Sequence, residues 1–118
     1  MKAQYHITKG VSAMRFDLSE FATSFATRAM ATQILDQIRE RLAPRGELQE
    51  LTVDLSGVRA ITPSFATAFI YGLHRLANQR RYKVTGVNIV STDPLMTARV
   101  RSVLDTHLEG TNSKVLVA

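Results

Sequence analysis

A serine at the expected start of a helix is the residue of this sequence best suited to reversible chemistry. Ser64 follows Thr62 and Pro63, and a threonine followed by a proline is typical of a helix N-cap and the first helical residue. A wheel drawn at about 100° per residue places Ser64 opposite the apolar side of that helix. A phosphoryl group there would meet free N–H groups and the positive end of the helix dipole. We therefore predict Ser64 as a candidate phosphoacceptor, and a plain capping role is the alternative.

The same side of this helix is polar along its length. The wheel places Phe65, Phe69 and Leu73 toward the core, and the opposite side carries residues able to form hydrogen bonds and ion pairs. A short loop with polar residues precedes the helix. Together these features predict a surface that binds a protein partner, formed by Ser56, Arg59, Thr62, Pro63, Thr67, Tyr71 and Arg75.

The residue types of common enzyme sites do not form recognisable motifs here. The chain has no Cys and no Gly-rich phosphate loop, and its three histidines are far apart in the sequence. One of them, His107, is expected to pack on the apolar side of the last helix. Asp54 ends an apolar strand, where its expected role is to cap the following turn. We predict a protein that is not an enzyme and that uses no cofactor and no metal.

The apolar patterns alternate between strand and helix periods, which predicts the α/β class. Residues 1–118 form a single expected domain, with a mixed sheet of four to five strands and three helices packed on it, in the order ββαβαβαβ. The expected strands are 3–8, 11–18, 48–55, 82–91 and 114–117, and the expected helices run from about 24 or 26 to 43, from 62 to 78 and from 93 to 109. Lys9-Gly10 is the expected first turn, and Pro44 with Gly46 and Gly110 are the expected stops of the first and third helices.

Composition narrows the classes of protein that remain. With 118 residues, of which 45% are hydrophobic, the chain can bury the core of one domain. No stretch approaches the roughly 20 apolar residues of a membrane span. The first ten residues lack the apolar centre of a secretory signal. These features predict a cytoplasmic protein without membrane insertion.

The net charge of +5 comes from one segment. Acidic and basic residues balance within 1–54 and within 93–118, whereas 55–92 contains no acid but holds Arg59, Arg75, Arg80, Arg81 and Lys83. A positive surface of this kind would attract an acidic protein surface or nucleic acid. The alternative is that the last three residues only follow a helix end, where cations interact well with the dipole. The aromatic residues and Gly-rich loops of RNA-binding surfaces are missing, which disfavours nucleic acid.

Two consecutive motifs resemble the strand–loop–helix signature of STAS domains, the fold of bacterial anti-sigma-factor antagonists. They are Val53-Asp54-Leu55-Ser56-Gly57-Val58 and Ile61-Thr62-Pro63-Ser64, and the resemblance covers nearly the whole chain. It implies that a partner kinase of the GHKL ATPase type phosphorylates a serine at the helix start, and that the unmodified form binds this partner and releases a sigma factor. The acceptor serine of the family aligns with Ser64.

The motif also departs from the antagonists. The stretch Thr62-Pro63-Ser64-Phe65-Ala66, together with Thr27-Arg28, is closer to STAS-like families of unassigned function, and Phe65 stands where antagonists have glycine. The leading hypothesis is a regulatory module that binds a GHKL-type ATPase, or another protein, through the Ser64 end of the helix.

Two other function classes stay open. The first is a constitutive STAS subunit of a transporter or another membrane complex, to which Ile70 would add apolar contact at the edge of the exposed side. The second is a small basic nucleic-acid binder. The sequence leaves the partner, the pathway and the formation of a homodimer open.

Overall fold

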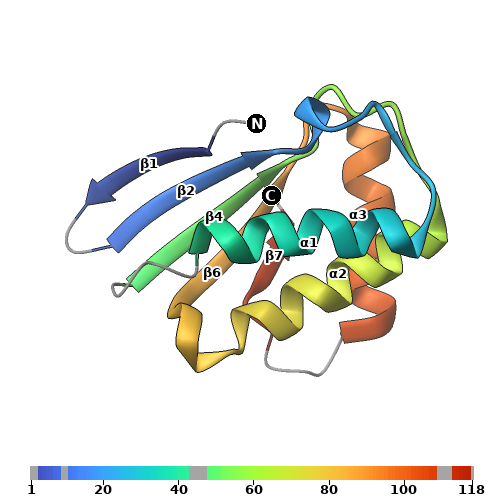
Figure 1. Ribbon diagram of the computed structural model, residues 1–118. Coiled ribbons are helices and arrows are strands. Elements are labelled where there is room, and N and C mark those ends of the chain that lie inside the picture. The colour runs from blue at the N-terminus through green and yellow to red at the C-terminus, as the bar shows by residue number, and fades with distance from the viewer. Residues whose placement is uncertain (1–2, 9–10, 43–47, 109–112, 118) are drawn as a thin grey trace.

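A five-stranded sheet forms the backbone of the molecule. The computed structural model describes residues 3–8, 11–42, 48–108 and 113–117. The strand order is β1-β2-β4-β6-β7, in which β1 is antiparallel to β2 and the other neighbours are parallel (Figure 1). The strands are β1 (Ala3–Thr8), β2 (Val11–Asp17), β4 (Leu48–Asp54), β6 (Val84–Val90) and β7 (Val115–Val117).

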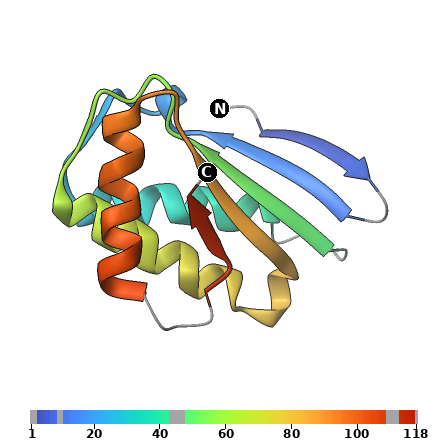
Figure 2. The same ribbon diagram turned by 180° about the vertical axis from the view of Figure 1, so that it is seen from behind.

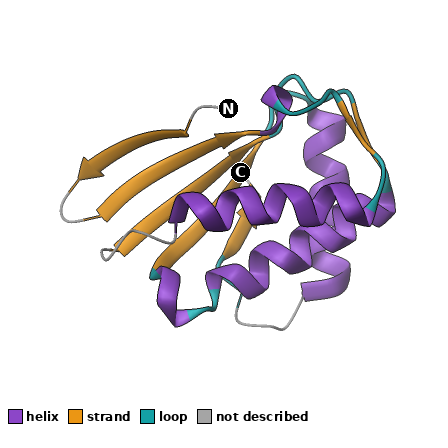
Figure 3. Cartoon of the chain, in the orientation of Figure 1, coloured by secondary structure: helices purple, strands orange, loops and turns teal. Residues whose placement is uncertain are grey.

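Three helices gather on one side of this sheet (Figure 3). They are α1 (Arg28–Leu42), α2 (Pro63–Ala77) and α3 (Pro94–Leu108). Side chains alternate between the two faces of a strand. In β4, Leu51 and Val53 are buried beneath the helices, whereas Glu50 on the other face is exposed. The predicted α/β class is thus confirmed: three helices pack on a mostly parallel sheet.

The structure also has short elements that hydrophobic periodicity cannot predict. The two-residue strands β3 (Ser24–Phe25) and β5 (Ala60–Ile61) pair in parallel with each other. Single 3₁₀ turns, η1 (Leu18–Glu20) and η2 (Arg80–Tyr82), follow β2 and precede β6. The pairing of β3 with β5 matters here because these two strands lead directly into α1 and α2. The turn and helix stops expected at Lys9-Gly10, Pro44, Gly46 and Gly110 lie outside the described residues.

Helix α2 lies between the other two helices. It contacts α1 on one flank and α3 on the other, and α3 in turn lies beside the edge strand β7 (Figure 2). The approach to α1 is close at Gly72, where an added Cβ would come within 2.1 Å of Leu35 Cδ1. The buried part of α2 is therefore wider than one apolar stripe, and only its remaining outer strip can meet a partner.

Among the described residues, no helix combines the length and the apolar character that crossing a membrane would require.

Candidate functional site

The start of α2 is capped as the sequence predicts. The Oγ1 atom of Thr62 accepts a hydrogen bond from the backbone N–H of Phe65 at 3.2 Å. Pro63 occupies the first helical position, where an N–H group would have no partner inside the helix. The cap therefore depends on the Thr62 hydroxyl and does not use Ser64.

The Ser64 side chain is exposed on the first turn of α2. The next residue, Phe65, is only 1% exposed and points into the core, where its ring contacts those of Phe25 and Phe69 at centroid distances of 4.9 and 5.3 Å. Phe65 therefore does not wall in the neighbouring hydroxyl of Ser64. Ser64 is open to a second macromolecule.

The start of α1 lies beside this turn. The Thr62 hydroxyl donates a hydrogen bond of 2.6 Å to the carbonyl of Ala26, two residues before α1 begins. The α1 start has its own hydroxyl contact, from the N–H of Met30 to Thr27 Oγ1 at 3.1 Å. Arg28, the first residue of α1, is exposed. Two helix starts, an exposed serine and an exposed arginine thus share one region of the surface.

Thr67, Tyr71 and Arg75 continue from Ser64 along α2, but they differ in accessibility. Arg75 is exposed, whereas Thr67 and Tyr71 are half-buried. The Tyr71 hydroxyl donates to the carbonyl of His107 at 3.2 Å, and its ring packs edge-on against that imidazole at 5.6 Å. Tyr71 therefore links α2 to α3. His107 itself is exposed, so its expected place on the apolar side of α3 is wrong.

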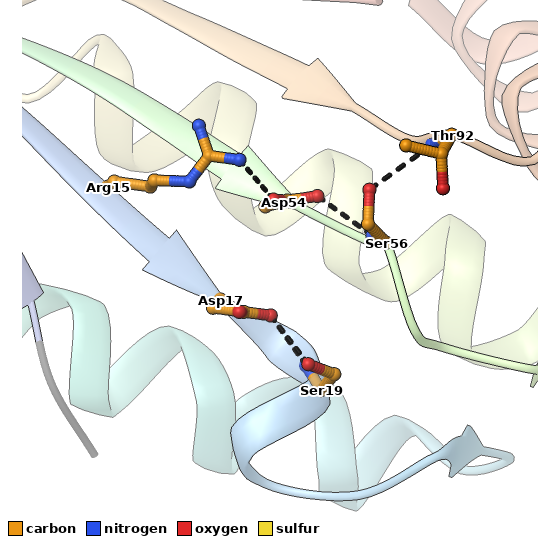
Figure 4. Close-up of polar contacts among 6 residues, drawn as sticks. All are labelled: Arg15, Asp17, Ser19, Asp54, Ser56 and Thr92. Atoms are coloured by element: carbon orange, nitrogen blue, oxygen red, sulfur yellow. Dashed lines mark hydrogen bonds and ion pairs between the residues drawn. The ribbon is translucent and has the colours of Figure 1, made fainter.

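Ser56, one of the two loop residues predicted for the same surface, lies elsewhere. Ser56 is half-buried at the carboxyl end of β4, where its Oγ accepts a hydrogen bond from the N–H of Thr92 at 3.2 Å (Figure 4). Arg59 is exposed, and its backbone N–H donates a hydrogen bond to the carbonyl of Thr23 at 2.7 Å. The strand β5 separates this loop from α2. The structure therefore brings together Thr62, Pro63, Ser64, Thr67, Tyr71 and Arg75, but it places Ser56 at the carboxyl ends of the strands.

A polar cluster surrounds Ser56 at that edge. Asp54 accepts a hydrogen bond from the Ser56 N–H at 2.8 Å, which is the turn cap that the sequence predicts, and it forms an ion pair with Arg15 of β2 (Figure 4). Asp17 accepts in the same way from Ser19, through its N–H at 3.1 Å and its hydroxyl at 2.8 Å. These polar groups satisfy one another and order the loops after β2 and β4.

The Asp54 carboxyl responds to both its burial and its partners. Burial alone would raise its pKa. Hydrogen bonds from the backbone and side chain of Ser56, together with the Arg15 guanidinium, outweigh burial and hold the pKa of Asp54 below its usual value. The carboxylate is therefore held ionised, as an ordering group of the loop.

The positive segment is divided by the fold. Arg75 lies on α2, but Arg80 and Arg81 follow the carboxyl end of this 15-residue helix. A helix of that length separates its two ends by about 22 Å. These arginines therefore do not share a surface with Ser64. Two arginines of α1, Arg28 and Arg39, lie beside α2 instead. They belong to residues 1–54, a segment in which acidic and basic residues balance.

The prediction that Ile70 adds apolar contact with a partner is wrong. Its side chain is 1% exposed, and it lines a small internal void together with Val100 of α3. Since α3 covers this side of α2, Ile70 is part of the core and cannot touch a partner.

Two open grooves flank the exposed strip of α2. One, of about 490 Å³, lies between the start of α2 and α3, with Pro63 and Arg99 on its walls. The other, of about 600 Å³, lies between α1 and α2. In the parts of the chain that the structure describes, no three His, Asp or Glu side chains lie close enough together to hold a metal ion.

Neither the models of known protein families, nor the curated proteins, nor the solved structures contain a match to this chain. The likeness to STAS domains therefore remains an expectation from the sequence motif.

Proposed function

We propose that this chain is a STAS-like regulatory module that binds a protein partner through the start of α2 and is switched by phosphorylation of Ser64. One observation carries the proposal: the Ser64 hydroxyl is exposed, while Thr62 caps the helix and Phe65 fills the core. The Ser64 side chain thus takes part in neither the helix cap nor the core, and it lies at the position where the motif has its acceptor serine. The resemblance names the partner class, a GHKL-type ATPase with serine kinase activity.

Phosphorylation at this position would alter the surface without disturbing the fold. The phosphoryl group would add about two negative charges at a helix N-terminus, where they are well tolerated. The surface beside it carries the cation Arg28, and further along α2 Arg75. A partner selected for this positive surface would be repelled by the new charge.

The experiment compares three variants for binding to a purified GHKL-type ATPase with serine kinase activity. Ser64→Asp mimics the modified state, and Ser64→Ala removes the acceptor without adding charge. Leu95→Asp is the matched control, because Leu95 is exposed at the equivalent position of α3, directly after Pro94. We expect Ser64→Asp to weaken binding about tenfold or more, and the other two proteins to bind like the wild type.

Equal affinity of Ser64→Asp and wild type would defeat the switch. If this indifference came with co-purification of membrane components, the constitutive subunit of a membrane complex would become the better assignment.

A further inference from the structure

The groove between α1 and α2 has a positively charged lining. Every fourth or third residue of α1 from Arg28 to Arg39 borders it, and one strip of α2 forms its other wall. The lining residues are Arg28, Thr32, Leu35, Arg39, Thr67, Ala68, Tyr71 and Arg75. None of them is acidic, so the groove combines three guanidinium groups with three hydroxyl groups.

Two of the three arginines are available to a ligand. Arg39 is paired with Asp36 of the same helix at 2.9 Å. Within the described part of the chain, neither Arg28 nor Arg75 forms an ion pair, and both are exposed. An anionic partner would therefore meet two arginines whose charge no carboxylate of the described residues neutralises.

The groove has the length of a short peptide. At a rise of about 1.5 Å per residue, the distance along α1 from Arg28 to Arg39 is about 16 Å. An extended segment of about five residues spans that distance. The lining includes Leu35, which is 5% exposed, and the half-buried Ala68, so the groove also offers apolar contact between its charged walls.

The lining favours protein over nucleic acid. Single-stranded nucleic acid is held by aromatic rings on which the bases stack. Tyr71 is the one aromatic residue of the lining, and its ring and hydroxyl are already engaged by His107. Without a free aromatic ring, the groove can offer charge and hydrogen bonds, which suit carboxylates of a peptide.

We infer that the α1–α2 groove binds an acidic peptide segment of the partner protein. This inference rests on the proposed function and deepens it, because it states the chemistry of the segment that docks. Ser64 lies one helical turn before Thr67 and Ala68 on the same side of α2, and thus at the Arg28 end of the groove. A phosphoryl group on Ser64 would compete with the acidic segment for that end.

The test uses a capped, fluorescent hexaglutamate peptide and the intact protein. The groove variant is Arg28→Glu with Arg75→Glu. The matched control is Arg80→Glu with Arg81→Glu, which makes the same change in net charge at exposed positions beyond the carboxyl end of α2. Hexaglutamine and a six-nucleotide thymidine oligonucleotide are the comparison ligands, and circular dichroism checks that both variants fold.

We expect hexaglutamate to bind the wild type and the control alike, to bind the groove variant about tenfold more weakly, and to lose affinity as salt is added. Amide resonances of Thr32, Thr67 and Ala68 should shift on binding. The proposal that the groove binds an acidic segment would be overturned by any of three results. They are an equal loss of hexaglutamate affinity in both double variants, equally tight binding of hexaglutamine, and no binding of hexaglutamate. Tighter binding of the oligonucleotide would reassign it to nucleic acid.

The two proposals fail separately. If the intact partner fails to bind the groove variant but binds Ser64→Asp like the wild type, the docking of an acidic segment is supported and the Ser64 switch is wrong. If the partner responds to Ser64→Asp and not to the groove variant, the switch stands and the acidic segment is wrong.

Discussion

The hydroxyl of Thr62 lies 2.6 Å from the carbonyl oxygen of Ala26 and donates a hydrogen bond to it. The Oγ1 atom of Thr62 also accepts a hydrogen bond from the backbone N–H of Phe65, so one side chain both caps α2 and ties it to the segment that enters α1. The pairing of β3 with β5 supports this connection from the preceding residues. The candidate acceptor Ser64 and the exposed Arg28 are therefore held in one region by contacts that involve neither of their side chains.

Replacing Thr62 by alanine should destabilise the protein. The change removes the α2 cap and leaves the Ala26 carbonyl without this donor. Loss of a helix cap costs about 1 kcal/mol, and up to about 2 kcal/mol, in free energy of unfolding. Urea unfolding measures the difference. Thr62→Ser keeps the hydroxyl and should retain most of the stability, and an equally large loss for serine would refute the capping role.

Substitutions of Ser64 should leave the fold intact. The side chain is exposed and takes no part in the cap, so Ser64→Ala should change the free energy of unfolding by no more than about 0.5 kcal/mol. Ser64→Asp places a negative charge near the helix N-terminus and should stabilise by about 0.3–1 kcal/mol. Thermal unfolding provides the comparison. A large loss of stability in either variant would show that the hydroxyl has a structural role.

A valine at position 72 should disturb the contact between α1 and α2. Even the first added carbon would lie 2.1 Å from Leu35 Cδ1, and Leu35 is buried. Overpacking of this kind costs about 1–3 kcal/mol in free energy of unfolding. The control is Ala98→Val at an exposed position of α3, where only the lower helix propensity of valine, at most about 0.7 kcal/mol, is expected. Equal stability of the two variants would contradict this close approach.

The Arg15–Asp54 pair should make stability depend on pH in the acid range. Because the pKa of Asp54 is lower in the folded chain than its ordinary value of 3.8, the folded state gains stability from this carboxylate above that value. The gain is lost as the pH falls through the lowered native pKa. Arg15→Gln removes one of the lowering influences, so the pKa of Asp54 should rise.

The pKa of Asp54 can be followed by NMR titration of its carboxyl carbon in the wild type and in Arg15→Gln. Arg39→Gln is a suitable control, because it breaks an ion pair with Asp36 on α1 and does not touch Asp54. An unchanged titration of Asp54 in Arg15→Gln would mean that the ion pair contributes nothing in solution.

The sequence predicted those features that depend on contacts between residues close together in the chain. The Thr62–Pro63 start of α2 and the turn cap of Asp54 each depend on residues no more than three positions apart, and the structure has both. The apolar repeats likewise predicted three helices packed on a mixed sheet, and the structure has three helices on a sheet that is parallel except for β1.

Relationships across the fold escaped prediction because no local pattern encodes them. Arg15 reaches Asp54 only because β2 and β4 pair in register over a separation of 39 residues. A helical wheel divides a helix into one buried and one exposed side, and it therefore puts Ile70 at the edge of the exposed side. In the structure α2 is covered on two flanks, by α1 and by α3, and Ile70 is buried. The positive groove was missed for a similar reason: Arg28 and Arg39 belong to a segment with balanced charge, and only packing sets them beside Arg75.

The proposed switch at Ser64 is tested most directly by the affinity of a GHKL-type ATPase partner for this protein in two states. Isothermal titration of the partner with unmodified protein and with protein carrying phosphoserine at position 64 gives both dissociation constants. We predict tight binding of the unmodified form and at least about tenfold weaker binding of the phosphorylated form. The same dissociation constant for both forms would contradict the switch.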